Sequence, residues 1–254
     1  MTNQMEKATA FKALHEADAP FIIPNPWDAG SAVLLEQAGF RALATTSSGF
    51  ATSIGRKDGE VTLEEKLEHC RLLSSVTSIP INADFENGFA DAPEETARNL
   101  TMLAETGVAG ASIEDYSRKE IYDFDLAVER IAACAEAVSK LNFPFQLTAR
   151  AEGLLRNVGD IDDAIKRLQA FESAGAHVLY APGLKSIEQV AMVVNAVSRP
   201  VNVLAPFMPN TTLAEYGKAG AHRISIGGAL AHHANKTTRE AADQMLHNGR
   251  FDGM

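Results

Sequence analysis

The sequence predicts an α/β fold in which residues 1–254 form a single (β/α)8 barrel, the TIM barrel architecture. Short β-rich apolar segments alternate with longer segments whose apolar residues recur at helical spacing. This alternation continues over about 250 residues, with no linker rich in proline, glycine or serine to divide it. A doubly wound open sheet is the alternative, but no GxGxxG motif follows the first predicted strand, which weakens its dinucleotide-binding version.

Eight segments are predicted as strands. They begin as FIIPN at 21, ALATTS at 42, INADFE at 81, GASIED at 110, FQLTAR at 145, HVLYAPG at 177, VNVLAP at 201 and RISIGG at 223. The clearest amphipathic helices between them are 63–76, 93–106, 161–174 and 186–197. Four junctions repeat a helix end, a glycine and a strand, so each of these glycines is predicted to end a helix in the left-handed conformation: Gly39, Gly107, Gly175 and Gly220.

Composition excludes several classes of partner. The chain carries 23 basic and 33 acidic residues, a net charge of −10, and no local cluster of Lys and Arg, so neither nucleic acid nor a membrane surface is expected to bind it. Cys70 and Cys134 have no CxxC spacing, which argues against a disulfide framework or a structural zinc site. The first residues lack the apolar core of a signal peptide, and no apolar run approaches membrane-spanning length. We therefore expect a cytoplasmic protein.

The stretch INADFENGF, residues 81–89, ends an apolar run with two carboxylates. Asp84 and Glu86 stand at i and i+2, which a strand directs to one face. Asn87-Gly88 is also a strong turn signal, so a solvated turn is the simpler explanation of this segment by itself. In a barrel, however, the carboxyl ends of the strands hold the active site.

Acidic groups from several strands are predicted to meet at that end. The polar residues that follow the first five strands are Asn25, Trp27 and Asp28, then Thr46, Ser47 and Ser48, Asp58 in the next loop, Asp84 and Glu86, Glu114 and Asp115, and Arg150 and Glu152. Several buried carboxylates beside one arginine are costly unless a cation compensates them. Mg²⁺, or alternatively Mn²⁺, suits such a set, with Asp84 as the direct ligand and Glu86, Glu114 and Asp58 holding its waters.

These residues resemble the isocitrate lyase and phosphoenolpyruvate mutase superfamily. NPWDAGSA at 25–32 and DFENGFA at 84–90 are similar to the family's NAWDALSA and DADTGYG stretches, and Ile113-Glu114-Asp115 and Ala149-Arg150 match its IED and AR. The resemblance implies a Mg²⁺-dependent enzyme that binds a 2-oxo acid or its enolate. Arg150 is then a catalytic residue that contacts the substrate, together with Glu114 and Asp58. The substrate-binding groups implied near the second strand are Trp27, Thr46, Ser47 and Ser48.

One departure limits the reaction. The lyases of the family carry a KKCGH motif after the fourth strand, whereas this chain reads DYSRKEIYDF from 115, with neither Cys nor His. Cleavage of isocitrate or methylisocitrate is therefore not expected. A smaller 2-oxo acid, with oxaloacetate as the leading example, needs only withdrawal of electrons from its C2 carbonyl and stabilisation of a pyruvate enolate by Mg²⁺ and Arg150. Arg118 and Lys119 are predicted to clamp its distal carboxylate.

Two alternatives remain open, and so does the assembly. The chain could be a phosphonate enzyme, of the phosphoenolpyruvate mutase or phosphonopyruvate hydrolase type, or a non-catalytic barrel that binds oxalate or a 2-oxo acid. Gly227-Gly228 could offer backbone N–H groups to a phosphate or simply allow a turn. The resemblance implies a homo-oligomer, dimer or tetramer, with an exchanged last helix, although little sequence remains for such an arm.

Overall fold

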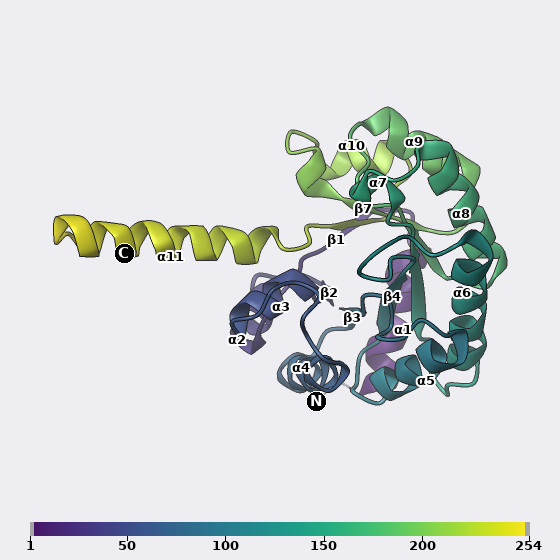
Figure 1. Ribbon diagram of the computed structural model, residues 1–254, viewed down its shortest axis with the longest axis horizontal. Helices are drawn as coiled ribbons and strands as arrows, with labels where there is room; N and C mark the ends of the chain where they lie inside the picture. The colour runs from purple at the N-terminus through teal and green to yellow at the C-terminus, as the bar shows by residue number, and fades with distance from the viewer. Residues whose placement is uncertain (1–2, 252–254) are drawn as a thin grey trace.

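A computed structural model describes residues 3–251 and contains eight parallel strands in the order β1-β8-β7-β6-β5-β4-β3-β2. The strands are β1 (Phe21–Ile23), β2 (Leu43–Ala44), β3 (Ile81–Asp84), β4 (Gly110–Glu114), β5 (Gln146–Arg150), β6 (Val178–Tyr180), β7 (Val201–Leu204) and β8 (Arg223–Ser225). The backbone N–H of Ala44 donates to the carbonyl oxygen of Pro24 at 3.0 Å, which joins β2 to the end of β1. The sheet therefore curves into a nearly closed barrel, as the sequence predicts (Figure 1).

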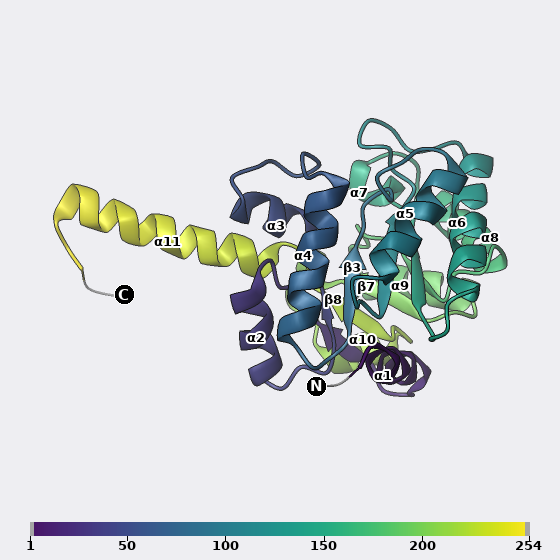
Figure 2. The ribbon, with the colours of Figure 1, turned by 90° about the horizontal axis from the view of Figure 1, so that it is seen from below.

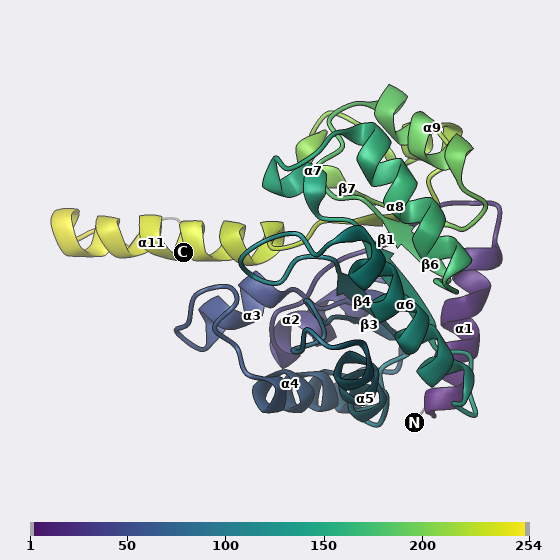
Figure 3. The ribbon, with the colours of Figure 1, turned by 45° about the vertical axis from the view of Figure 1, so that its right-hand side comes forward.

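Helices surround this barrel on the outside (Figure 3). Those between consecutive strands are α2 (Ala29–Gln37), α4 (Leu63–Val76), α5 (Pro93–Ala104), α6 (Phe124–Ser139), α8 (Ile161–Ser173), α9 (Ile187–Ala196) and α10 (Leu213–Lys218). Short helices at the carboxyl ends of strands are α3 (Ser47–Ser53), α7 (Gly153–Arg156) and the 3-10 turn η1 (Ala205–Phe207). The helix α11 (Ala229–Asn248) leaves the barrel and projects into solvent (Figure 1).

The ends of the helices follow from local sequence. Thr62 and Glu65 form a capping box at the start of α4, in which each side chain accepts a hydrogen bond from the other's backbone N–H. The four junction glycines adopt φ angles between 84° and 104°, as predicted. A side chain with a Cβ atom rarely adopts this conformation, so glycine allows each chain reversal from helix to strand.

The apolar core lies between the barrel and its helices, and the inside of the barrel is polar. Residues such as Leu147 and Ala149 of β5 are buried in the main hydrophobic cluster, while the intervening Thr148 faces the barrel interior. The helix α1 (Gln4–Glu16) closes the amino-terminal end, where Phe11 and His15 pack edge-to-face against Phe21. Figure 2 shows α1 and the short helices α3 and α7 at opposite ends of the barrel. No described helix is both long and apolar enough to span a bilayer.

Candidate active site

A cavity of about 370 Å³ opens at the carboxyl ends of the strands and continues into the barrel. Its volume lies in the range of small-molecule binding sites. Its lining residues come from most of the strands and the loops that follow them: Ile23, Asn25, Ala44, Thr45, Thr46, Ser47, Ser48, Asp58, Asn82, Asp84, Ser112, Arg150, Leu155, Arg156, Tyr180, Asn202, Leu204, Arg223, Ser225, Gly227 and Gly228. A smaller cavity of about 170 Å³ shares Ser47, Asp58, Arg150 and Arg156 with it.

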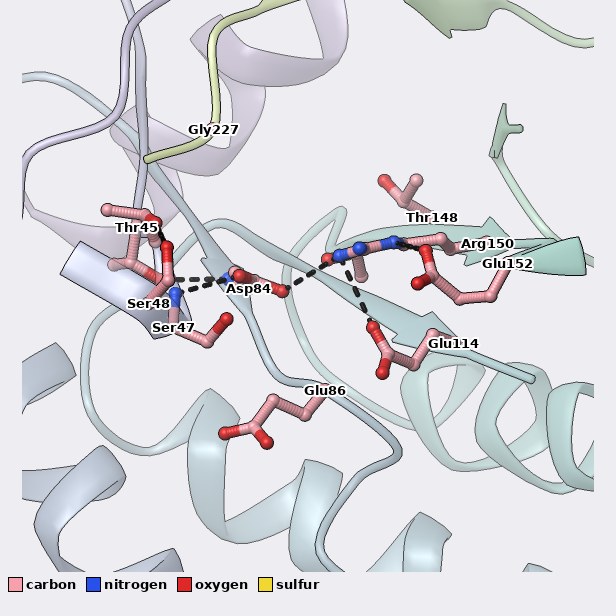
Figure 4. Close-up of polar contacts among 12 residues, drawn as sticks. Thr45, Ser47, Ser48, Asp84, Glu86, Glu114, Thr148, Arg150, Glu152 and Gly227 are labelled. Carbon is pink, nitrogen blue, oxygen red and sulfur yellow. Dashed lines mark hydrogen bonds and ion pairs between the residues drawn. The ribbon is translucent and has the colours of Figure 1, made fainter. Parts of the chain in front are cut away.

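Asp84, the last residue of β3, is held on three sides (Figure 4). Its Oδ2 accepts the backbone N–H of Ser47 at 2.9 Å, and its own backbone N–H donates to Oγ1 of Thr45 at 2.8 Å. Its Oδ1 lies 3.3 Å from Nη1 of Arg150. Burial opposes ionisation, but Arg150, Lys66 and the Ser47 N–H outweigh it and hold the pKa of Asp84 below its usual range. Asp84 is therefore a carboxylate at neutral pH.

Arg150, the last residue of β5, connects three acids. Its Nη1 lies 3.3 Å from Asp84 and 3.3 Å from Oε2 of Glu114, and its Nε donates to Oε1 of the fully buried Glu152 (Figure 4). Its guanidinium carbon also lies 5.3 Å from the centre of the Tyr180 ring, within the range of a cation–π contact. Burial disfavours the charge, yet Glu152 and Glu114 dominate and raise the pKa of Arg150 further, so the arginine is always charged.

Glu86 and Glu114 are buried carboxyl groups whose negative charge, when ionised, the described residues compensate only in part. Burial raises the pKa of Glu114 well above its ordinary value despite Arg150, and it raises the pKa of Glu86 despite an ion pair of 2.9 Å with Arg118. Oε1 of Glu86 is buried with no hydrogen-bond partner among the described residues. An unsatisfied buried carboxylate oxygen is costly, and a cation or its water would satisfy it.

This donor set fits a hard divalent cation. Every donor is a carboxylate oxygen, the ligand type that Mg²⁺ prefers, and Mg²⁺ commonly binds through one or two carboxylates and several waters. No group of three or more His, Cys, Asp or Glu side chains lies close enough together to ligate an ion directly within residues 3–251. Asp84 lines the larger cavity, Glu86 and Glu114 line the smaller one, and Asp58 lines both, so a cation at Asp84 would reach the other acids through its waters.

Most of the predicted site residues line the two cavities. Those brought together are Thr46, Ser47, Ser48, Asp58, Asp84, Glu86, Glu114, Arg118 and Arg150. The backbone N–H of Ser47, which the sequence assigns to substrate, donates instead to Asp84 in this structure. Gly227 and Gly228 both line the larger cavity, but the N–H groups of Ile226 and Gly227 donate to Oδ1 of Asn25, so the Gly227 N–H is not free to bind a phosphate.

Two predicted substrate-binding residues lie elsewhere. Trp27 lines a separate hollow on the outside of the barrel with Phe50 and His69, and its carbonyl oxygen lies 3.0 Å from Nε2 of His69. The chain turns toward α2 after Asn25, so Asn25 faces the larger cavity and Trp27 does not. Lys119 is exposed at the tip of its loop and lines neither cavity, because Arg118 adopts a positive φ of 73° that turns the loop at this point.

Several lining residues were not singled out from the sequence as site residues. Thr45 supports Asp84 and accepts a hydrogen bond from the buried Nζ of Lys66 at 3.0 Å. Asn202 and Arg223 line the deeper part of the cavity, and Arg156 lines both cavities. A polar residue within an otherwise apolar strand is the signal that could have identified the interior ones, because alternate residues of a strand share a face.

Comparison with known proteins agrees with this geometry. Residues 11–246 match the family model for phosphoenolpyruvate phosphomutase. The 2-methylisocitrate lyase of Escherichia coli K12 is 30% identical over 203 residues, which cover 76% of this chain and 67% of that enzyme. A candidate lyase/mutase from Burkholderia cenocepacia J2315 superposes with a TM-score of 0.94 at 46% identity, covering 98% of this chain and 91% of the other. Oxaloacetate acetylhydrolase, solved with its product oxalate, gives a TM-score of 0.90 at 25% identity over 100% of this chain and 91% of the other.

Fold and site together define a (β/α)8-barrel enzyme with an acidic centre at the carboxyl ends of its strands. Within that class, the chain belongs to the isocitrate lyase and phosphoenolpyruvate mutase superfamily. Its homologues include 2-methylisocitrate lyase and 2,3-dimethylmalate lyase.

Proposed function

We propose that this protein is a Mg²⁺-dependent enzyme that cleaves a carbon–carbon bond of a small 2-oxo acid such as oxaloacetate. The supporting observation is the position of Arg150, whose charged guanidinium lies between Asp84 and Glu114 and lines both cavities. The Arg150 guanidinium at that position would face the oxygen of a substrate carbonyl that approaches Asp84. It can therefore stabilise the negative charge that develops on this oxygen as the bond breaks.

The cation that the acids would hold supplies Lewis-acid polarisation of the 2-oxo group. The residues that would hold it are Asp84, with Glu86, Glu114 and Asp58 around it. Mn²⁺ has the same preference for oxygen ligands and is the alternative ion.

The chain's own groups orient the substrate and balance its charge. In decarboxylation of oxaloacetate the C3–C4 bond breaks, carbon dioxide leaves, and the electron pair becomes part of an enolate whose oxygen faces Arg150. The enolate carbon then takes a proton from water, because the loop from 115 to 124 carries no cysteine or histidine to donate one. Glu152 and Tyr180 keep the Arg150 guanidinium in place during this change.

The opening of the two cavities at the carboxyl ends of the strands is called the mouth. The far carboxylate of such a substrate would lie there beside positively charged arginine side chains. Arg118 and Arg156 both line the smaller cavity. Arg156 stacks 4.0 Å above the ring of Tyr116 and pairs with Glu152 at 3.0 Å, so its position is fixed. Arg118 stands over Phe89 at 5.0 Å and pairs with Glu86. Lys119 has no part in this arrangement, because it is exposed outside the cavities.

A substrate panel on purified protein tests the proposal. Release of pyruvate from oxaloacetate that needs Mg²⁺ and stops with chelator is the expected result. Phosphate release from phosphonopyruvate would indicate a phosphonate enzyme instead, a possibility that the phosphomutase family model keeps open. Tight binding of oxalate without turnover of either compound would indicate a non-catalytic barrel. Either of the last two outcomes would contradict the proposal.

We also propose that the protein is a homo-oligomer, a dimer or a tetramer, assembled through α11. Among the described residues of this helix only Ala231 is buried, while Leu246 is 78% exposed. Exchange of the last helix between subunits requires a helix that projects from the barrel, and α11 is such a helix, 20 residues long (Figure 1). This is longer than the short carboxyl-terminal segment that the sequence led us to expect. Light scattering at micromolar concentration should find an oligomer, and a variant that ends at residue 228 should be monomeric. A full-length monomer would contradict the proposal.

A further inference from the structure

A buried arginine without an acidic partner stands at the inner end of the larger cavity. Arg223, the first residue of β8, is 3% exposed and lines this cavity. Its Nε donates to Oδ1 of Asn202 at 2.8 Å, its Nη2 donates to Oγ1 of Thr148 at 3.1 Å, and its Nη1 lies 3.3 Å from Nε2 of His15. Burial and the proximity of Arg223 lower the pKa of His15 to about 3, so this ring is neutral. All three partners are therefore uncharged.

The positive charge of Arg223 is uncompensated. Burial lowers its pKa to about 10, so the guanidinium remains protonated at neutral pH. Within the described part of the chain it forms no ion pair, whereas Arg167, which is also buried at 9% exposure, pairs with Asp115 and Asp163. A guanidinium has five N–H donors, and the bonds above use three of them. A buried charge with unused donors is costly unless a counter-ion joins it.

The register of the strands places Arg223 and Arg150 in one row of side chains. Arg150 pairs with Tyr180, Tyr180 with Asn202, and Asn202 with Arg223 across neighbouring strands. Paired residues of adjacent strands point to the same face of a sheet, and all four line the larger cavity. The row begins at the carboxyl end of β5 and reaches the first residue of β8. The cavity thus has one arginine near its mouth and another at its inner end.

We propose that the inner end of the cavity is an anion subsite, in which Arg223 binds a carboxylate or another small monoanion. Asn202 lines the same cavity, and its amide has a second N–H besides the one donated to Oγ of Ser225 at 2.9 Å. The anion is a separate small carboxylate, because the far carboxylate of the proposed substrate is assigned to Arg118 and Arg156 in the smaller cavity. The proposal depends on Arg223 and its neutral surroundings, and it holds whether or not the chain cleaves oxaloacetate.

Acetate in the absence of metal and substrate tests the subsite directly. Thermal unfolding is followed in chelator at constant ionic strength, which is set with a bulky sulfonate salt. Acetate should raise the unfolding midpoint of the wild-type chain in a saturable way, and it should not raise that of Arg223→Met. The matched control is Arg130→Met, because Arg130 is 1% exposed but bonds to the carbonyl oxygens of residues 87, 90 and 91, outside both cavities. An unresponsive wild type, or an undiminished response in Arg223→Met, would overturn the subsite.

A second variant keeps the test decisive if Arg223→Met does not fold. Thr148→Asp places a carboxylate beside Nη2 of Arg223 and so supplies the missing negative charge from within the chain. This variant should have a raised midpoint without acetate and no response to acetate, while Thr148→Asn should respond as the wild type does. A wild-type response in Thr148→Asp would refute the proposal.

Kinetics identify the source of the anion. For a separate anion, acetate should alter the unfolding midpoint of the wild type while the KM of Arg223→Lys for oxaloacetate stays at the wild-type value. An increase of this KM on the order of tenfold, with unchanged affinity for the shorter oxalate, would instead place the far carboxylate of the substrate at Arg223 and contradict both the separate anion and the contact with Arg118. The acetate measurement needs no turnover, so it separates failure of the subsite from failure of the proposed reaction.

Discussion

The two arginines of the larger cavity have opposite surroundings. Arg150 contacts Asp84, Glu114 and Glu152, whereas Arg223 contacts only neutral side chains. Both belong to one row of inward-facing residues, so the difference arises from which residues the neighbouring loops and strands bring to each end. The mouth has an excess of negative charge that suits a metal cation, and the inner end has an excess of positive charge that suits an anion.

Loss of the Asp84 carboxylate at the mouth should have the largest effect on ligand binding. Asp84→Ala should abolish Mg²⁺-dependent binding of oxalate, because Asp84 is the carboxylate that the structure keeps ionised beside Ser47. The chain should remain folded, since Arg150 keeps Glu114 and Glu152 as partners. Titration calorimetry with and without Mg²⁺ measures the effect, and circular dichroism checks the fold.

Glu86→Gln and Glu114→Gln serve as graded comparisons for that variant. Contacts made through water can rearrange in part, so each should weaken oxalate binding less than Asp84→Ala does. Undiminished Mg²⁺-dependent binding in Asp84→Ala would show that the metal assignment is wrong.

Loss of the positive charge at the mouth should reduce turnover next most strongly. Arg150→Ala should lower kcat for oxaloacetate by about 10²–10³-fold, the usual cost of removing a group that stabilises developing oxyanion charge. Its effect on kcat should exceed its effect on KM, because the contact strengthens as the enolate forms. Steady-state kinetics with saturating Mg²⁺ measure both constants.

Arg150→Lys controls for stability in that experiment, since it retains a charge next to the buried Glu114 and Glu152. It should fold better than Arg150→Ala while remaining slower than the wild type, because an ammonium cannot reproduce the planar contact. A kcat unchanged in Arg150→Ala would exclude this enolate mechanism.

The mouth could be predicted from the sequence more fully than the inner end. Asp84, Glu114 and Arg150 each end a strand, and the carboxyl ends of parallel strands meet at one rim whatever the details of the barrel. The structure and the family model also confirm the predicted strands, the left-handed junction glycines and the family. Each of these predictions depends only on a local sequence pattern. Arg223 begins its strand, and only the stagger between neighbouring strands brings it into the cavity of Arg150. That stagger is not encoded in any one segment.

Two predicted substrate-binding residues lie outside both cavities for a similar reason. Trp27 and Lys119 follow strands, as site residues should, yet one faces the outside of the barrel and the other lies exposed on a loop. The direction of a side chain in an irregular loop depends on backbone turns such as the positive φ of Arg118, which spacing in the sequence does not reveal.

Burial of His15, a neutral neighbour of Arg223, predicts that the stability of the fold depends on pH. The pKa of buried His15 is lowered to about 3, so the folded protein binds fewer protons than the unfolded chain at any pH between that value and the ordinary 6.5. His15 therefore contributes stability that is fully present above pH 6.5 and is lost progressively as the pH falls toward 3. From pH 7 to pH 5, His15 alone should lower the free energy of unfolding by about 2 kcal/mol.

Urea unfolding at the two pH values measures this loss. His15→Gln should show a smaller dependence on pH than the wild type, because its amide cannot take up a proton and its oxygen can still accept from Arg223. His233→Gln, at an exposed position of α11, should keep the wild-type dependence. Equal dependence in all three proteins would show that the pKa of His15 is not lowered and that this neighbour of Arg223 is not held neutral.

The smallest effect is expected from the loop at the mouth, where two neighbouring basic residues have different positions. Arg118 lines the smaller cavity and pairs with Glu86, whereas Lys119 is exposed outside it. Arg118→Ala should raise KM for oxaloacetate several-fold with little change in kcat, because a contact with the far carboxylate is made equally in the ground state and the transition state. Lys119→Ala should change neither constant, and it removes the same charge from the same loop, so it controls for long-range electrostatics. Equal effects of the two substitutions would mean that the loop acts only through its net charge, and an unchanged KM in Arg118→Ala would remove the clamp altogether.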